Sequence, residues 1–139
     1  MNQKSAIQIM LGLLSLVIVF HFCIMAKVIP YNIAWGGRIT NDTEMYVFET
    51  ISILINLFLG TILLMKGNYI AFQFREKIVN RVLWVFVVIF ILNTVGNIFA
   101  QTNFEKSFAV LTLLFALLIW RILWKNIAEP TASVPVKSS

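Results

Sequence analysis

The sequence has few of the charged residues that a water-soluble protein needs. Charged residues make up 12% of the 139 residues and hydrophobic residues 60%, and the mean hydropathy is +0.88. A water-soluble domain of this size could not stay in solution with this balance. The composition therefore predicts an integral membrane protein, with room for about four spans of roughly 20 residues and for no separate soluble domain.

Cysteine and histidine are scarce as well. The chain has one cysteine, Cys23, and one histidine, His21. One cysteine excludes a disulfide framework and a Cys-x-x-Cys redox pair, and a zinc site needs several ligands where one histidine supplies a single one. We therefore predict no metal site and no cofactor, and assign no catalytic residue.

Positive charge exceeds negative charge, with a net charge of +5. In a soluble protein this excess would suggest a nucleic-acid partner. Here the Lys and Arg residues lie beside apolar segments, where they orient a membrane protein and meet anionic headgroups. We therefore expect membrane lipids as partners and no nucleic acid.

Long apolar runs predict four transmembrane helices, at about residues 6–29, 46–65, 82–100 and 108–124. At about 1.5 Å per residue, each run crosses most or all of about 30 Å of hydrocarbon. The first run is too long for the core of a secretory signal, so we interpret it as a signal anchor that stays in place. The fold expected is an all-α integral membrane protein: a four-helix antiparallel bundle over residues 1–128, followed by a disordered cytoplasmic tail at 129–139.

The connections carry turn and capping signals. Pro30 and the glycine pair at 36–37 break the chain after the first span. One of the residues at 41–43 is expected to cap the second helix, and residues 74–81 read as an early, cytoplasmic start of the third.

Basic residues are divided unequally between the two sides of the predicted bundle. The N-terminus, the second connection and the C-terminal side hold 8 of them, and the first and third connections hold 3. Because the more basic side stays in the cytoplasm, both termini are predicted to be cytoplasmic. The predicted location is the plasma membrane, as the inner membrane of a bacterium.

Polar side chains recur along two of the predicted spans. In the second, Glu49, Ser52 and Asn56 fall on one stripe of the helix, and in the third Asn93, Asn97 and Gln101 repeat every four residues. If these two helices pack as antiparallel partners, the stripes meet. We then expect a polar cleft that opens outward and closes at the level of Asn56 and Asn93.

Glu49 is the sharpest candidate in this cleft, because an ionisable carboxyl group inside a span is costly unless it is paired or hydrated. Three partners are available to it: His21, Lys27 and Arg38. Pairing with His21 would allow proton exchange, whereas a nearby Lys27 or Arg38 would form a structural ion pair. The alternatives are that Glu49 is wetted from the surface, binds a ligand, or takes part in catalysis.

The other candidates also have structural interpretations. His21 could simply bond to a neighbouring helix, and Asn56, Asn93 and Asn97 could hold helices together. Trp35 and Arg38 in the first loop could cover the cleft, with Arg38 meeting an anionic headgroup or phosphate, or could be interfacial anchors. The predicted ligand-binding set is Glu49, His21, Ser52, Asn56, Asn93, Asn97, Gln101, Arg38 and Trp35.

Three functions remain open from the sequence. The first is binding or transport of a small ligand or lipid headgroup in the cleft. The second is a structural or accessory membrane subunit without a ligand, and the third is a membrane enzyme that uses His21 and Glu49 as an acid–base pair on a lipidic substrate. A homodimer or a membrane-protein partner is a further possibility, with the small residues Ala109, Thr112 and Ala116 on one face of the fourth helix as a packing surface.

Overall fold

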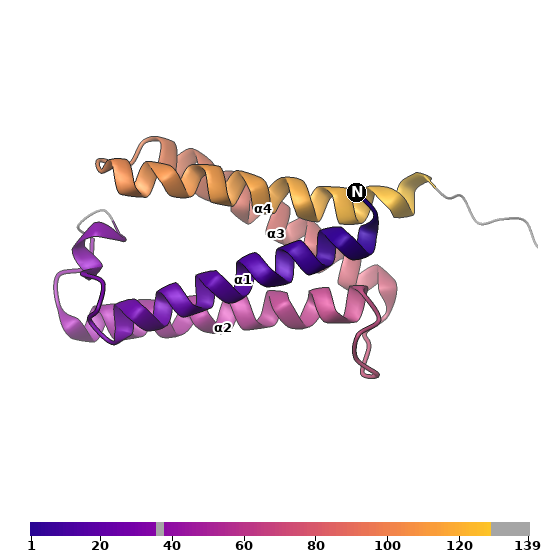
Figure 1. Ribbon diagram of the computed structural model, residues 1–139, viewed down its shortest axis with the longest axis horizontal. Helices are drawn as coiled ribbons and strands as arrows, with labels where there is room; N and C mark the ends of the chain where they lie inside the picture. The colour runs from indigo at the N-terminus through magenta and orange to yellow at the C-terminus, as the bar shows by residue number, and fades with distance from the viewer. Residues whose placement is uncertain (36–37, 129–139) are drawn as a thin grey trace, which may run out of the picture.

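The computed structural model describes residues 1–35 and 38–128, and over these residues the chain folds into helices and short connections (Figure 1). The elements in chain order are α1 (Gln3–Met25), the short 3-10 turn η1 (Tyr31–Ile33), α2 (Asp42–Lys66), α3 (Glu76–Ile98) and α4 (Asn103–Ala128). The four α-helices are each long and apolar enough to cross a membrane. The prediction of an all-α protein with four candidate spans is confirmed. The predicted tail at 129–139 and the glycine pair at 36–37 lie outside the described residues.

The long helices associate as two pairs, α1 with α2 and α3 with α4 (Figure 1). The α2 and α3 helices touch much less than either pair does. The hypothesis that α2 and α3 pack as antiparallel partners holds only in part: they contact each other at Phe58–Phe86 and Lys66–Asn80, but each packs more closely on another helix. The connection between them, residues 67–75, allows α2 to pack on α1 and α3 to pack on α4.

Small residues bring α4 close to α3. Ala109 and Ala116 are buried, and between them the hydroxyl oxygen of Thr112 lies 2.8 Å from that of Thr94 on α3. Short side chains permit this close approach, and hydroxyl groups then bond across the seam. This face of α4 is thus used inside the bundle, so the suggestion that it carries a dimer contact is wrong.

The first helix ends earlier than its apolar run. Lys27 adopts a left-handed conformation with φ of 57°, and the Val28 backbone N–H donates to the Cys23 carbonyl oxygen at 2.9 Å. This geometry is a Schellman cap, and it stops α1 at Met25 instead of at residue 29. Asn68 caps α2 in the same way, but there the Gly67-Asn68 pair is a typical sequence signal.

The starts of the later helices agree with the capping signals. The Asn41 side chain accepts a hydrogen bond from the Glu44 backbone N–H at 2.9 Å, which confirms a cap at residues 41–43. Asp42, in the first turn, pairs with the Lys27 ammonium, and this hydrogen bond raises the pKa of Lys27. The early start of the third helix is also confirmed, since α3 begins at Glu76.

One end of the bundle is tightly packed. At this end the N-termini of α1 and α3 meet the C-termini of α2 and α4, and we call it the packed end. Side chains from all four helices are buried there together, including Met10, Leu63, Leu83 and Ile119. Their packing holds the two helix pairs together at this end.

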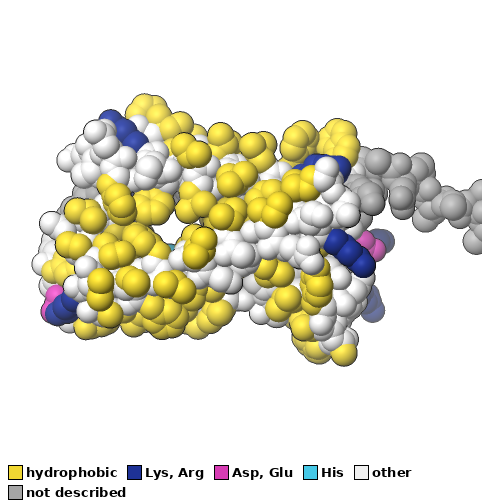
Figure 2. All heavy atoms as spheres, in the orientation of Figure 1, with side chains coloured by type: hydrophobic (Ala, Val, Ile, Leu, Met, Phe, Trp, Pro, Cys, Tyr) yellow, Lys and Arg dark blue, Asp and Glu magenta, His cyan; other side chains and the backbone are white. Residues whose placement is uncertain are grey.

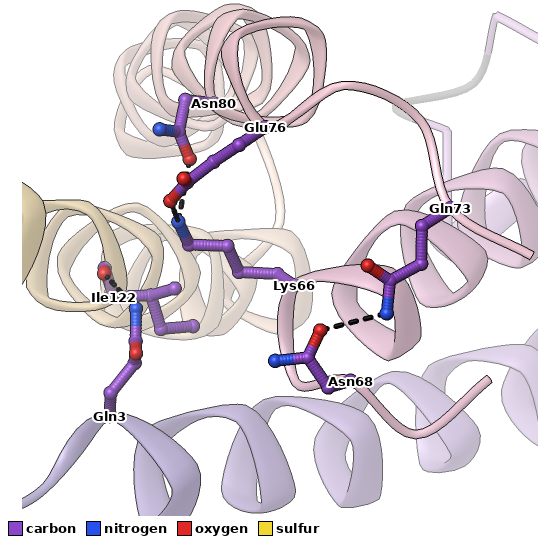
Figure 3. Close-up of polar contacts among 7 residues, drawn as sticks. All are labelled: Gln3, Lys66, Asn68, Gln73, Glu76, Asn80 and Ile122. Atoms are coloured by element: carbon purple, nitrogen blue, oxygen red, sulfur yellow. Dashed lines mark hydrogen bonds and ion pairs between the residues drawn. The ribbon is translucent and has the colours of Figure 1, made fainter. Parts of the chain in front are cut away.

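Polar contacts also link the helices at the packed end (Figure 3). The Lys66 ammonium, at the end of α2, donates to Asn80 Oδ1 at 2.8 Å and to Glu76 Oε1 at 3.1 Å, both on α3. Gln3 of α1 donates through Nε2 to the Ile122 carbonyl oxygen of α4 at 2.9 Å. These bonds tie α2 to α3 and α1 to α4, so the two pairs are joined at this end by polar as well as apolar contacts.

Candidate functional site

At the opposite end the two helix pairs separate around a cavity of about 1070 Å³. Residues of all four long helices and of the loop after η1 line it, and an opening between α1 and α4 is visible in Figure 2. Its volume lies near the upper limit of ordinary small-molecule pockets, which hold about 300–1,000 Å³. We call this end of the bundle the cavity end.

The carboxyl group of Glu49 is fully buried behind the cavity wall. Its exposed fraction is 0%, so the alternative that Glu49 is wetted from the surface is wrong. Oε2 lies 2.6 Å from Nδ1 of His21, and Oε1 accepts a hydrogen bond from Nε1 of Trp35 at 2.7 Å. Of the three partners considered from the sequence, the structure selects His21, because Lys27 pairs with Asp42 instead.

The His21 ring lies between Glu49 and the cavity. Its side chain is 14% exposed and lines the cavity wall. Since Nδ1 faces the Glu49 carboxylate, Nε2 is the ring atom left for another partner. The carboxylate therefore orients the ring and occupies one of its two nitrogens.

A small apolar cluster holds the loop that carries Trp35. Ile24, Ile39 and Met45 are buried together, and Trp35 packs against them. The indole ring also contacts Phe48, with ring centroids 5.3 Å apart. These contacts fold the first loop back over the cavity end and direct the indole N–H at the carboxylate.

The amide side chains of the two predicted stripes do not bond to one another. Asn56 donates through Nδ2 to the Ser52 carbonyl oxygen of its own helix at 2.7 Å. Asn93, Asn97 and Gln101 line the cavity and have no side-chain hydrogen bond to residues 1–35 or 38–124. Direct bonds between the stripes therefore do not explain why these amides lie in apolar helices.

The structure brings most of the predicted ligand-binding set to one place. The following predicted residues line the cavity: His21, Trp35, Arg38, Ser52, Asn56, Asn93, Asn97 and Gln101. The ninth, Glu49, lies behind His21 and Trp35 instead of on the wall. It is placed to orient the histidine, and a ligand in the cavity would meet His21 first.

Sequence reasoning missed Glu105, a second carboxylate in the cavity wall. Its exposed fraction is 5%, and its Oε2 accepts a hydrogen bond from the Thr102 hydroxyl at 2.8 Å. The Glu105 backbone N–H donates in return to that hydroxyl at 3.2 Å. This Thr-x-x-Glu pattern before an apolar run is a capping box, and it was a signal for both the start of α4 and the placement of this side chain.

Phenylalanine rings, also missed, bridge α1 and α4 at the cavity end. The rings of Phe20 and Phe108 have centroids 5.4 Å apart, and those of Phe104 and Phe108 are 5.2 Å apart. Phe20 precedes His21, so this aromatic bridge lies at about the depth of the His21–Glu49 pair. It connects the two helix pairs where they otherwise diverge.

No group of three or more His, Cys, Asp and Glu side chains within the described part of the chain is arranged to hold a metal ion. Comparison with protein-family models, with curated proteins and with solved structures gave no match to this chain.

Proposed function

We propose that this protein is a multi-pass plasma-membrane protein that binds or transports a small ligand or lipid headgroup in its cavity. The observation that carries the proposal is the His21 ring on the cavity wall, backed by the fully buried Glu49 at 2.6 Å. An ionisable pair inside an apolar bundle is costly, and such pairs usually mark a functional pathway or site. The unbonded amides of Asn93 and Asn97 on the same wall support it.

In this proposal the pair acts as one unit. Glu49 and the Trp35 indole hold the ring in place, so that binding a ligand costs little further side-chain ordering. His21 Nε2 and the amides address the polar part of the ligand, and the apolar wall contacts the rest. Apolar walls with a few polar groups in fixed positions are the usual make-up of a ligand pocket.

We further propose that the packed end faces the cytoplasm and the cavity end faces outward, with both termini inside. The basic residues of the N-terminus and of the α2–α3 connection support this orientation, because the more basic side is retained in the cytoplasm.

A cysteine-labelling experiment in intact cells tests this orientation. On a Cys23→Ser background, Thr40→Cys in the exposed first loop should react with a membrane-impermeant maleimide, whereas Gln73→Cys in the α2–α3 connection should react only after lysis. Reaction of Gln73→Cys in intact cells, without reaction of Thr40→Cys, would reverse the orientation.

The ligand proposal is tested by mass spectrometry of the lipids and small molecules that co-purify in mild detergent. We expect a specific species with the wild-type protein and its loss, by at least about tenfold, from the double variant His21→Leu/Glu49→Leu. The double variant removes both members of the pair and leaves no buried charge behind. Asp42→Asn is the matched control, because Asp42 lies at the same end, is exposed, and does not line the cavity.

The same measurement separates the alternatives. Identical bulk lipid in all three preparations would contradict ligand binding and favour a structural or accessory subunit. An acid–base enzyme is a second candidate, since the 2.6 Å separation of His21 and Glu49 meets its geometric requirement. In that case Glu49→Gln should retain the bound species but abolish its conversion, because the ring would lose the carboxylate that orients it.

A further inference from the structure

The cavity wall changes from polar to apolar along the helix axes. His21 and Gln101 lie at the cavity end, whereas Leu13 and Phe86 line the deeper part, towards the packed end. At about 1.5 Å per residue, Leu13 and His21 are separated by about 12 Å along α1. A ligand that fills this cavity would therefore have a polar group at one end and an apolar body on the order of 10 Å or longer.

The apolar part of the cavity reaches the side of the bundle. Leu16 and Leu92 both line the cavity, yet their exposed fractions are 67% and 65%. Beyond the cavity, towards the packed end, lie fully buried side chains such as Met10 and Ile119. Because these four helices are apolar enough to span a membrane, the side of the bundle is where lipid chains would lie, and the opening between α1 and α4 in Figure 2 faces that side.

The polar part of the wall has unused hydrogen-bond donors. The carboxylate of Glu49 already accepts from Trp35 and faces His21, and that of Glu105 accepts from Thr102. By contrast, Arg38 is among the residues that line the cavity, and its exposed side chain has no hydrogen bond or ion pair with residues 1–35 or 39–124. Arginine favours carboxylate and phosphate oxygens, which accept two of its N–H groups at once.

We propose that the ligand is a single-chain amphiphile with an anionic carboxylate or phosphate head, and that it enters from the bilayer through the side opening. Its head lies against Arg38 and His21, and its chain extends towards Leu13 and Phe86. This inference rests on the proposed ligand-binding function and names the class of ligand.

Quenching of Trp35 fluorescence by spin-labelled stearic acids tests it. With Trp84, Trp120 and Trp124 replaced by phenylalanine, Trp35 is the only tryptophan and reports from the polar end of the cavity. In lipid nanodiscs we expect 5-doxylstearic acid to quench it saturably, at about one molecule per protein. The 16-doxyl isomer should quench it less, because its nitroxide is carried to the apolar end.

The matched neutral ligand is the methyl ester of 5-doxylstearic acid. We expect it to bind about tenfold more weakly than the acid, which corresponds to the loss of one charge-assisted hydrogen bond. In the Arg38→Gln variant the affinity for the acid should fall to that for the ester. Displacement by unlabelled stearate or by a lysophosphatidic acid then distinguishes a carboxylate head from a phosphate head.

Equal affinities of the acid and the ester for the wild-type protein would overturn the anionic head. Quenching that never saturates with either probe would overturn the amphiphile. If the mass spectra nevertheless showed a specific co-purified species, the proposed function would stand with a different class of ligand. Absence of both signals would remove the proposed function as well.

Discussion

His21→Leu is expected to lower the free energy of unfolding by about 3–5 kcal/mol, because it leaves the fully buried Glu49 carboxylate without its ring partner. The double variant His21→Leu/Glu49→Leu should recover most of that loss. Replacing both members of a buried pair with apolar side chains removes the unpaired charge together with its partner. Denaturant or thermal unfolding in mild detergent measures both values.

Asp42→Asn is the control for this cycle. It breaks the Lys27–Asp42 ion pair, whose side chains are about half exposed, and exposed pairs contribute only about 0–1 kcal/mol. A His21→Leu variant as stable as Asp42→Asn would show that Glu49 tolerates the loss of the ring. A double variant no more stable than the single one would show that the ring has a packing role independent of the charge.

Ile119→Ala is expected to cost about 2–3 kcal/mol of unfolding free energy. Ile119 is fully buried in the packed end, and truncation there leaves a void that the surrounding helices cannot fill. Comparable truncations in soluble cores cost about 2–5 kcal/mol. We expect the lower part of that range because lipid chains reduce the transfer contribution while the packing contribution remains. The midpoint of thermal unfolding in mild detergent, with and without added lipid, measures the effect.

Leu111→Ala is the matched comparison on the same helix. Leu111 lines the cavity and is only partly buried against the core, so its truncation enlarges an existing space and should cost about 1 kcal/mol, less than a fully buried truncation. A cost equal to that of Ile119→Ala would mean that the cavity end is packed as tightly as the other end. The contrast between the two variants therefore tests the division of the bundle into a packed end and a cavity end.

Part of the candidate site could be predicted from helical periodicity, whereas His21, Trp35 and Arg38 were predicted from their position near the outer end of the first span or in the first loop. Polar side chains at helical spacing in an apolar span must share a face, and eight of the nine predicted residues do line one cavity. The role of Glu49 was less predictable, because three basic partners were available near the same end of the predicted spans. Lys27 lies in the left-handed cap of α1 and pairs with Asp42, so Glu49 pairs with His21 instead.

Glu105 shows how a local signal can be overlooked. The Thr102–Glu105 capping box was readable in the sequence, yet the apolar run alone suggested a start near 108 for the fourth span. The helix begins at Asn103, where the Thr102 hydroxyl accepts a hydrogen bond from the Glu105 backbone N–H, ahead of the apolar run. The capping pattern therefore indicates the start of α4, and with it the position of the Glu105 carboxylate, more accurately than hydropathy does.

The sequence by itself determined that the chain has four long apolar helices, where their polar stripes lie, and which end is more basic, because hydropathy, helical period and charge are properties of local segments. Only the tertiary structure decided that α1 pairs with α2 and α3 with α4, that Glu49 is buried behind His21 and Trp35, and that the stripes face a cavity. These features depend on side-chain volume across helices: Ala109, Thr112 and Ala116 allow α4 to lie close to α3, whereas bulky side chains fill the packed end and phenylalanine rings bridge α1 and α4 at the cavity end.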